Sequence, residues 1–371
     1  MNRFRWSMPA ALALAFVMFS PLRAEAAPEI DEATYARINQ SLVERYLVPR
    51  YETLAGAAAR LKDAAEGFCA GRHSIEPVHS AYDEAMDAWM GVQHIGFGPA
   101  ELFMRSYRIQ FWPQARGKFG SAVEELLATD DPSQLTPEAL RNASVAAQGL
   151  PAIEVLLYAP HADLPGDEGD GVSRCDVLVA TSANVEEMTA GLLSDWTGGE
   201  APFTGILGSP GPENPYFETA EDATLVLFKS LYAGLELILT AKLRPVLSKS
   251  AEAARPDLAE SPLSGRSLRN IVLNLQTLQE MYDVGDGTGF AEAVRTRGDT
   301  ELDELLSKAF RMTRETAESV KDPMTEAVGS PQKRPQLEKL MTQVQALKQI
   351  VQTRLADALG LGVGFNALDG D

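Results

Sequence analysis

The chain has 371 residues, enough for two or three ordinary domains with a large core. It carries 33 lysines and arginines against 52 aspartates and glutamates, so the formal net charge is −19 at pH 7. This negative charge argues against nucleic acid and anionic membranes as partners. It is compatible with attracting cations, although solubility alone also accounts for it.

The first 26 residues have the pattern of a signal peptide. Two arginines precede an apolar run from Met8 to Phe19, and Ala24 and Ala26 follow at the spacing of a signal-peptidase site. We therefore expect residues 1–26 to be removed near Ala26 and the mature protein to be periplasmic. No later run of about 20 apolar residues was recognised, so no membrane span is expected in the mature chain.

The sequence contains two cysteines, Cys69 and Cys175. In an exported protein two cysteines form a disulfide more readily than a metal site. The entropic model assigns a loop of this length a stabilisation of roughly 4–5 kcal/mol. We interpret the pair as structural.

Apolar residues recur at helical spacing along nearly the whole chain. Tyr35, Ile38, Leu42 and Tyr46 begin the pattern at i, i+3, i+7 and i+11. Further helices are expected up to Phe68, from Val78 to Trp89, from a Thr136 cap to Tyr158, after a Ser173 cap, and over 219–247, 264–284, 300–320 and 334–359. No convincing strand pattern is present, so the sequence predicts an all-α protein.

Glycine and proline crowd the stretch 198–215, where no helix is expected. The simplest architecture is two helical bundles joined through this stretch. The predicted division is an N-terminal bundle over 27–197, a connection over 198–218 and a C-terminal bundle over 219–371.

The stretch "QGLPAIEVLLY" places Glu154 in an apolar run. On a helix Glu154 shares a face with Leu150 and Leu157, so its carboxylate is expected to be buried. A buried carboxylate needs a cation, a metal ion or several hydrogen-bond donors. An ion pair with Arg108 or Arg116 would be a purely structural answer.

A proline stands three residues before this carboxylate. Pro151 has no N–H, so the sequence predicts a kink that frees the carbonyl of Ala147, and Gly149 loosens the same turn. A free backbone oxygen near Glu154 would suit a hard cation.

The segment 91–117 interrupts the helical pattern with glycines, prolines and aromatic residues. Its His94 could donate or ligate, Arg108 could bind a carboxylate, and Trp112 could shape a pocket. The alternative is a structured loop in which Trp112 fills the core, and a lone histidine is more often structural. In a second irregular stretch, 259–268, capping of the following helix accounts for the serines.

Common catalytic motifs are absent from the sequence: there is no HExxH, Walker A, GxSxG or GxGxxG pattern. The histidines do not pair at helical spacing, which argues against a zinc hydrolase. At the C-terminus Asn366, Asp369 and Asp371 could coordinate a cation, although such residues usually form an acidic tail.

Several of these irregular stretches together resemble the imelysin family, whose hallmark is GxHxxE on a helix. The stretches are "GLPAIEVLLY", "FGP" with "RIQFWPQARGK", "ESPLSGRSL" and "VGFNALDGD". The resemblance spans roughly residues 30–371. It implies two bundle-like helical halves with a site between them, lined by the signature helix.

The imelysin family is associated with peptidase activity and with exported proteins of iron uptake, and the resemblance carries both expectations. Gly149 and Glu154 match the first and last hallmark positions, whereas Pro151 stands where the family has histidine. One ligand of the family's metal chemistry is therefore missing, and His94 is a candidate replacement.

The preferred interpretation is a periplasmic imelysin-like protein that binds a metal ion, such as iron or another divalent cation, or a small ligand. Its process would be iron uptake or homeostasis, with other periplasmic iron-uptake components as possible partners. The expected ligand-site residues are Arg108, Trp112, Gly149, Pro151 and Glu154, with Glu154 and His94 as candidate metal ligands. A metallopeptidase and a non-enzymatic interaction protein are the alternatives.

Overall fold

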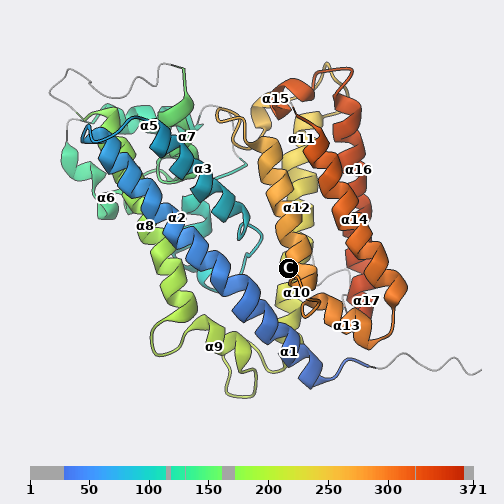
Figure 1. The fold of residues 1–371 in the computed structure, drawn as a ribbon. Coiled ribbons are helices and arrows are strands. Elements are labelled where there is room, and N and C mark those ends of the chain that lie inside the picture. Colours follow the sequence, from blue (N-terminus) through green and yellow to red (C-terminus); the bar gives the residue numbers. More distant parts are fainter. Residues whose placement is uncertain (1–28, 114–117, 130, 161–171, 322, 363–371) are drawn as a thin grey trace, which may run out of the picture.

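The computed structural model describes residues 29–113, 118–129, 131–160, 172–321 and 323–362 (Figure 1). Every regular element in these ranges is a helix, which confirms the predicted all-α class. The predicted signal peptide and the candidate ligands Asn366, Asp369 and Asp371 lie outside the described residues.

The N-terminal part begins with one uninterrupted helical run. It consists of α1 (Glu32–Leu42), a π-helical segment η1 (Val43–Leu47) and α2 (Val48–Cys69). Asp31 caps the run by accepting a hydrogen bond from the backbone of Thr34. α2 packs along α8 (Arg174–Thr197) and α3 (Glu76–Met90), and these helices form the core of the N-terminal half.

The start of α8 is held in two ways. Ser173 and Asp176 form a capping box, which confirms Ser173 as the cap. Cys175, in the first turn of α8, forms a disulfide with Cys69 at the end of α2. The predicted pairing of the two cysteines is confirmed.

The prediction of one helix from Thr136 to Tyr158 is wrong. Thr136 caps a helix, but that helix, α6 (Pro137–Asn142), is short. A turn of 3-10 helix follows at Val145–Ala147, and α7 (Leu150–Tyr158) begins afresh. Pro151 therefore lies in the first turn of α7, where a missing N–H costs nothing, and not at a kink within a longer helix.

The glycine- and proline-rich stretch contains a helix, contrary to expectation. α9 (Phe203–Gly208) forms because Phe203 is buried against Trp196, with their ring centroids 5.2 Å apart. Tertiary packing of one aromatic side chain outweighs the local breakers here.

The C-terminal half is a bundle of long helices, in yellow to red in Figure 1. Its elements are α10 (Ala220–Leu237), π-helical η6 (Ile238–Leu243), α11 (Arg244–Leu247), α12 (Ser267–Asp283), α13 (Phe290–Thr296), α14 (Thr300–Ser319), α15 (Met324–Ala327), α16 (Arg334–Ile350), π-helical η8 (Val351–Leu355) and α17 (Ala356–Ala358). α14 packs between α12 and α16, and α10 contacts both α12 and α16. The helices expected over 219–247, 300–320 and 334–359 agree closely with these bounds.

Shorter helical pieces connect the long helices. They are η2 (Gly98–Ala100), η3 (Leu102–Met104), α4 (Arg105–Ile109), α5 (Lys118–Leu127), η4 (Pro132–Leu135), η5 (Val145–Ala147) and η7 (Pro256–Leu258). Most of them belong to the N-terminal half, where α4, α5, α6 and α7 all contact α8.

One helix, Ala220–Leu247, is long and apolar enough to cross a membrane by length and composition, contrary to the expectation that no later apolar run reaches this length. In the structure 56% of the most apolar 18-residue stretch of this helix is buried. It packs against α1, α12 and α16, so its apolar surface is covered by other helices of the protein.

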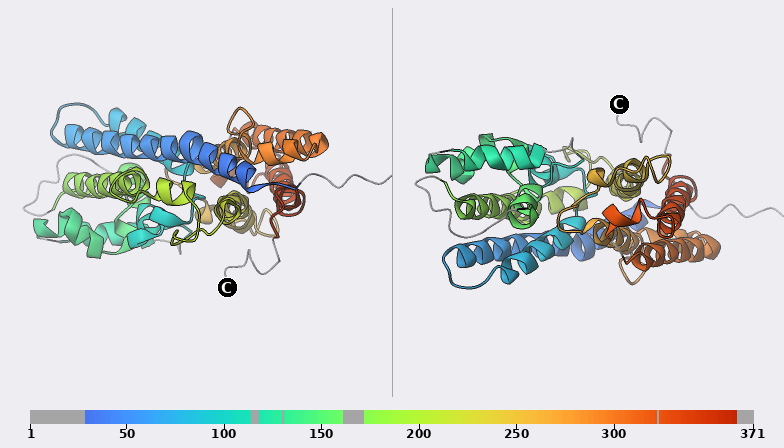
Figure 2. Two further views of the ribbon diagram at one scale, coloured as in Figure 1. Left: turned by 90° about the horizontal axis from the view of Figure 1, so that it is seen from below. Right: turned by 90° about the horizontal axis from the view of Figure 1, so that it is seen from above.

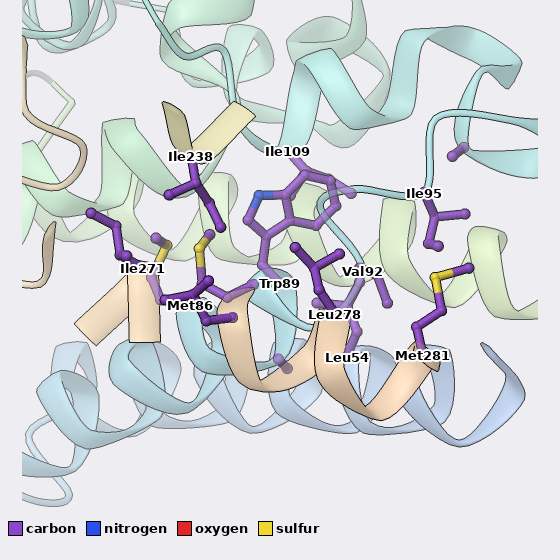
Figure 3. Packing of buried hydrophobic residues seen from close by; sticks show 14 of the residues in the cluster. Leu54, Met86, Trp89, Val92, Ile95, Ile109, Ile238, Ile271, Leu278 and Met281 are labelled. Atoms are coloured by element: carbon purple, nitrogen blue, oxygen red, sulfur yellow. The ribbon is translucent and has the colours of Figure 1, made fainter. Parts of the chain in front are cut away.

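The two halves pack against each other through an extensive interface, called the join below (Figure 2). α1 packs against α10 and α13 of the C-terminal half, although its continuation α2 belongs to the N-terminal half, and α3 packs against α12. Figure 3 shows Trp89 of α3 among Ile238 of η6, Ile109 of α4 and Leu278 of α12. The division of the chain at 198–218 stays a prediction. α1 precedes this boundary in the sequence but packs with helices that follow it.

Candidate functional site

Glu154 is buried, with only 4% of its surface exposed, as its position in an apolar run predicts. Its partners are hydrogen-bond donors from the other half of the protein. The backbone N–H and the hydroxyl of Ser264 donate to Glu154 Oε1 over 2.8 Å and 2.6 Å. The backbone of Leu263 is a further donor to this carboxylate.

Burial raises the pKa of the Glu154 carboxyl, because the ionised form loses its hydration. The hydrogen bonds from Ser264 and the backbone of Leu263 lower this pKa in part, and the negative charge of Glu260 raises it further. The carboxyl therefore holds its proton more strongly than an exposed glutamate does.

A cavity of about 300 Å³ lies beside Glu154, between the two halves. One wall comes from the segment before α5, from α5 and from α7, and the opposite wall is the segment that precedes α12. Its described lining residues are Gln110, Trp112, Phe119, Gly120, Pro151, Glu154, Val155, Ala159, Asp257, Leu258, Ala259, Ser261, Pro262 and Leu263. Mostly apolar walls with a few polar groups are typical of small-molecule sites.

Gly149 and Pro151 shape the start of α7. Gly149 is its N-cap residue, and a Cβ added there would lie 2.2 Å from the carbonyl oxygen of Ile109. The two backbones thus approach as closely as only glycine permits. Pro151 lines the cavity. These two residues position α7, and with it Glu154, against the 105–112 segment.

Arg108 does not pair with Glu154, and Arg116, the other candidate for an ion pair, lies outside the described residues. The guanidinium of Arg108 is buried and donates to Gln148 Oε1 over 2.7 Å and to Asn184 Oδ1 over 3.2 Å. Burial lowers the pKa of Arg108. These partners are amide groups within the N-terminal half. Arg108 therefore lies behind the residues that line the cavity and is not itself a lining residue.

Trp112 lines the cavity on the side opposite the Leu263 wall and is half-buried. Its ring centroid lies 5.8 Å from Nζ of Lys242, within the range of a cation–π contact. The structure therefore brings Trp112, Pro151 and Glu154 together at one cavity, with Gly149 supporting it.

His94 is not brought to this cavity. The ring is buried, and its Nε2 lies 2.8 Å from the hydroxyl of Tyr46. Burial, together with the nearby charge of Arg50, lowers the pKa of His94 to about 3, so the imidazole is neutral at pH 7. Its place beside Tyr46 and Gly234 is that of a packed interior histidine.

A second buried polar cluster adjoins the cavity, and its central residue, Lys242, was not among the predicted site residues. Lys242 Nζ and Glu260 Oε2 lie 2.6 Å apart, and both side chains are almost completely buried. Glu260 also accepts from Gln93 over 2.8 Å and from Gln110 over 3.0 Å. Burial lowers the pKa of Lys242, whereas the adjacent Glu260 raises it.

A signal for this cluster was present in the sequence. Lys242 interrupts an apolar run in "LILTAKLRPVL" just as Glu154 interrupts its own. Two charged residues of opposite sign, each in an apolar helical run, are a reason to expect buried polar sites in the interior.

The serines before α12 do not cap that helix, contrary to expectation. The N-cap residue is Arg266, and no side chain caps it. Ser264 instead donates to Glu154, and Arg266 forms ion pairs with Asp83, over 2.7 Å, and Asp87 of α3. The segment 259–266 is thus a connection between the halves, and it supplies one wall of the cavity.

The described residues give limited support for a resident metal ion. Among them, no group of three or more His, Cys, Asp and Glu side chains is placed to hold one. The described partners of Glu154 are the N–H and hydroxyl of Ser264 and the backbone of Leu263, which all donate to the carboxylate. A cation at Glu154 would need most of its ligands from water or from a bound molecule.

The chain matches the family model described as Imelysin over residues 47–351. The crystal structure of an imelysin-like protein from Psychrobacter arcticum 273-4 aligns with a TM-score of 0.73 at 20% identity, over 92% of this chain and 100% of that one. A "putative iron-regulated protein A precursor" from Parabacteroides distasonis ATCC 8503 aligns with a TM-score of 0.72 at 14% identity, over 89% and 97%. No curated protein matches the chain.

Proposed function

Because the chain belongs to the imelysin family, we propose that it is an exported protein that binds a small ligand or a metal ion in the Glu154 cavity. Its process is iron uptake or homeostasis. The observation that carries this proposal is a buried carboxylate, with no cationic partner among the described residues, at the wall of a mostly apolar cavity of about 300 Å³.

Two features support a ligand over a purely structural role for Glu154. The described partners of the carboxylate are uncharged donors of Ser264 and Leu263, which leaves its negative charge without a cationic partner among the described residues. Burying such a group costs free energy that a bound ligand would offset. The cavity walls also combine apolar contacts with the aromatic face of Trp112.

The link to iron comes from similarity alone. One protein of the same fold is named as iron-regulated. Pro151 replaces the histidine of the family hallmark in this chain, and the described residues supply few further ligands at Glu154. We therefore favour a form of iron that arrives with its own coordinating groups over a bare ion.

The experiment is a calorimetric titration of the purified mature chain. The probes are ferrous and ferric iron, zinc, copper and calcium ions, and ferric citrate as an iron complex that brings its own oxygen ligands. We expect binding by the wild type and at least a tenfold weaker affinity for Glu154→Gln, equivalent to about 1.4 kcal/mol.

Glu124→Gln is the matched control, because Glu124 is exposed on α5 and does not line the cavity. Equal binding by Glu154→Gln and the wild type would overturn the assignment of the site. Hydrolysis of casein that is lost on chelation and in Glu154→Gln would favour a metallopeptidase. No binding of any probe would favour a non-enzymatic interaction protein.

A further inference from the structure

The second polar cluster has the form of a cation-binding cage. Three side-chain oxygens surround Nζ of Lys242: Glu260 Oε2 and Asn274 Oδ1 at 2.6 Å each, and Gln93 Oε1 at 2.8 Å. The sulfur of Met90 lies at 3.4 Å. An ammonium group has three N–H donors, and each of these oxygens can accept one of them.

The cage is assembled from parts of the chain that lie far apart in sequence. Gln93 follows α3 in the N-terminal half, Glu260 lies in the segment before α12, and Asn274 is on α12. Lys242 enters from η6, one of the π-helical segments, and such segments are frequent at functional sites. The cation therefore lies where the two halves meet.

The cage requires a positive charge. Glu260 is only 2% exposed, and its ion pair with Lys242 is its one salt bridge among the described residues. The amides of Gln93, Gln110 and Asn270 donate to its carboxylate, but they carry no charge. Removing the ammonium would leave a buried carboxylate without a counter-ion, which is strongly destabilising.

The cage is also close to solvent-accessible space. Trp112 and Gln110 both line the Glu154 cavity; the ring of Trp112 lies 5.8 Å from Lys242 Nζ, and Gln110 donates to Glu260. Gln110 and Trp112 thus contact both the cavity and the cage.

We propose that Gln93, Glu260 and Asn274 form a cation site that the chain fills with its own Lys242 ammonium. When the lysine side chain is shortened, the site takes a free monovalent cation of the ammonium class. The inference does not depend on what the Glu154 cavity binds. It gives the join between the halves an organising cation that belongs to the chain itself.

The test is chemical rescue of Lys242→Ala. The melting temperature is measured in equal concentrations of ammonium, methylammonium, sodium and tetramethylammonium chloride. Tetramethylammonium carries the same charge but has no N–H donor. We expect ammonium or methylammonium, at about ten times its Kd, to raise the melting temperature of Lys242→Ala by roughly 3 °C over the other two salts.

The wild type and Lys308→Ala, which removes an exposed lysine of α14, should show no difference among the four salts. An identical response of Lys242→Ala to all salts would overturn the proposal. So would a Lys242→Ala protein as stable as the wild type in sodium chloride, because the cage would then need no cation.

A measurement on the wild type keeps the test decisive if Lys242→Ala does not fold. A caged, fully hydrogen-bonded ammonium exchanges its protons slowly, so ¹⁵N-selective NMR should show one lysine NH₃⁺ signal at neutral pH that Lys308→Ala retains. Absence of any such signal would mean that the cage does not hold a charged ammonium, and the proposal would fail.

Discussion

His94 illustrates how burial, with a nearby positive charge, determines the charge of a residue. Its ring lies between Tyr46 and the helix that carries Gly234, where a Cβ on Gly234 would come within 3.0 Å of His94 Cβ. The hydroxyl of Tyr46 is also 3.1 Å from the carbonyl of Thr277, which it can reach only as a donor. Nδ1 of His94 is buried and has no hydrogen-bond partner among the described residues, so a second proton on this ring would find no acceptor there.

We predict that His94 makes the protein less stable in mild acid. Its folded pKa of about 3 lies below the ordinary value of 6.5, so the unfolded chain binds a proton that the folded chain excludes. This contribution to stability is complete above pH 6.5 and is lost as the pH falls toward 3. The loss should reach about 2 kcal/mol at pH 5.

Urea unfolding of the wild type and His94→Gln at pH 7.5 and pH 5 measures this effect. The free energy of unfolding should fall by about 2 kcal/mol more in the wild type than in His94→Gln, which cannot titrate. Equal losses in the two proteins would show that His94 is accessible to protons in the folded state.

At the scale of single elements, the start of α7 determines where Glu154 lies. The helix cannot begin earlier, because Gly149 has an extended backbone and lies against the carbonyls of Arg108 and Ile109. Pro151 then fits the first turn without loss of a hydrogen bond. The carboxylate of Glu154 consequently faces Ser264 across the join.

We expect Gly149→Ala to destabilise the protein by about 2–3 kcal/mol, because the new Cβ would meet a backbone oxygen that cannot move independently. Thermal or urea unfolding measures the change. Gly120→Ala is the control: Gly120 lies in α5, no atom of the described residues comes within 4 Å of the added Cβ, and alanine should be neutral or stabilising there. Comparable losses in both variants would refute the close-approach explanation.

At the scale of the whole molecule, the halves are tied by helices and by side chains. α1 packs on α10 and α13 while its continuation α2 packs on α8. Arg266 pairs with Asp83 and Asp87 of α3, and Ser264 donates to Glu154 of α7. Motion of one half against the other would have to break these contacts.

We therefore predict that the two halves unfold together. Far-UV circular dichroism and tryptophan fluorescence should report coincident transitions in urea, although the chain is long enough for two independent units. Arg266→Met should lower the free energy of unfolding by about 1–3 kcal/mol. The whole transition should then move to lower urea concentration without splitting. Separate transitions of the two probes in the wild type would contradict this account.

Most of the helices followed from local patterns in the sequence. Ser173 and Thr136 were identified as caps because their side chains bond only a few residues ahead, and the capped starts of α8 and α6 agree. The prediction of one long helix ending at Tyr158 was wrong for a non-local reason. Its interruption depends on the backbone of Ile109, which no pattern around Gly149 reveals.

The same distinction holds for the candidate site. The burial of Glu154 was predicted from its apolar neighbours at helical spacing, and the pairing of Cys69 with Cys175 from their number in an exported chain. The partner of Glu154 was not predicted, because Ser264 lies 110 residues away and its neighbouring sequence resembles an ordinary helix cap. The use of Glu154 as a ligand-binding group stays a prediction.

The sequence by itself determined the all-α class, the disulfide and the position of a carboxylate in an apolar face, because these depend on short-range periodicity and composition. Only the tertiary structure decided which groups meet that carboxylate, where the cavity lies and that Lys242 is enclosed by oxygens from both halves. Such contacts depend on how distant helices pack, and the spacing of residues along one helix carries no information about its neighbours.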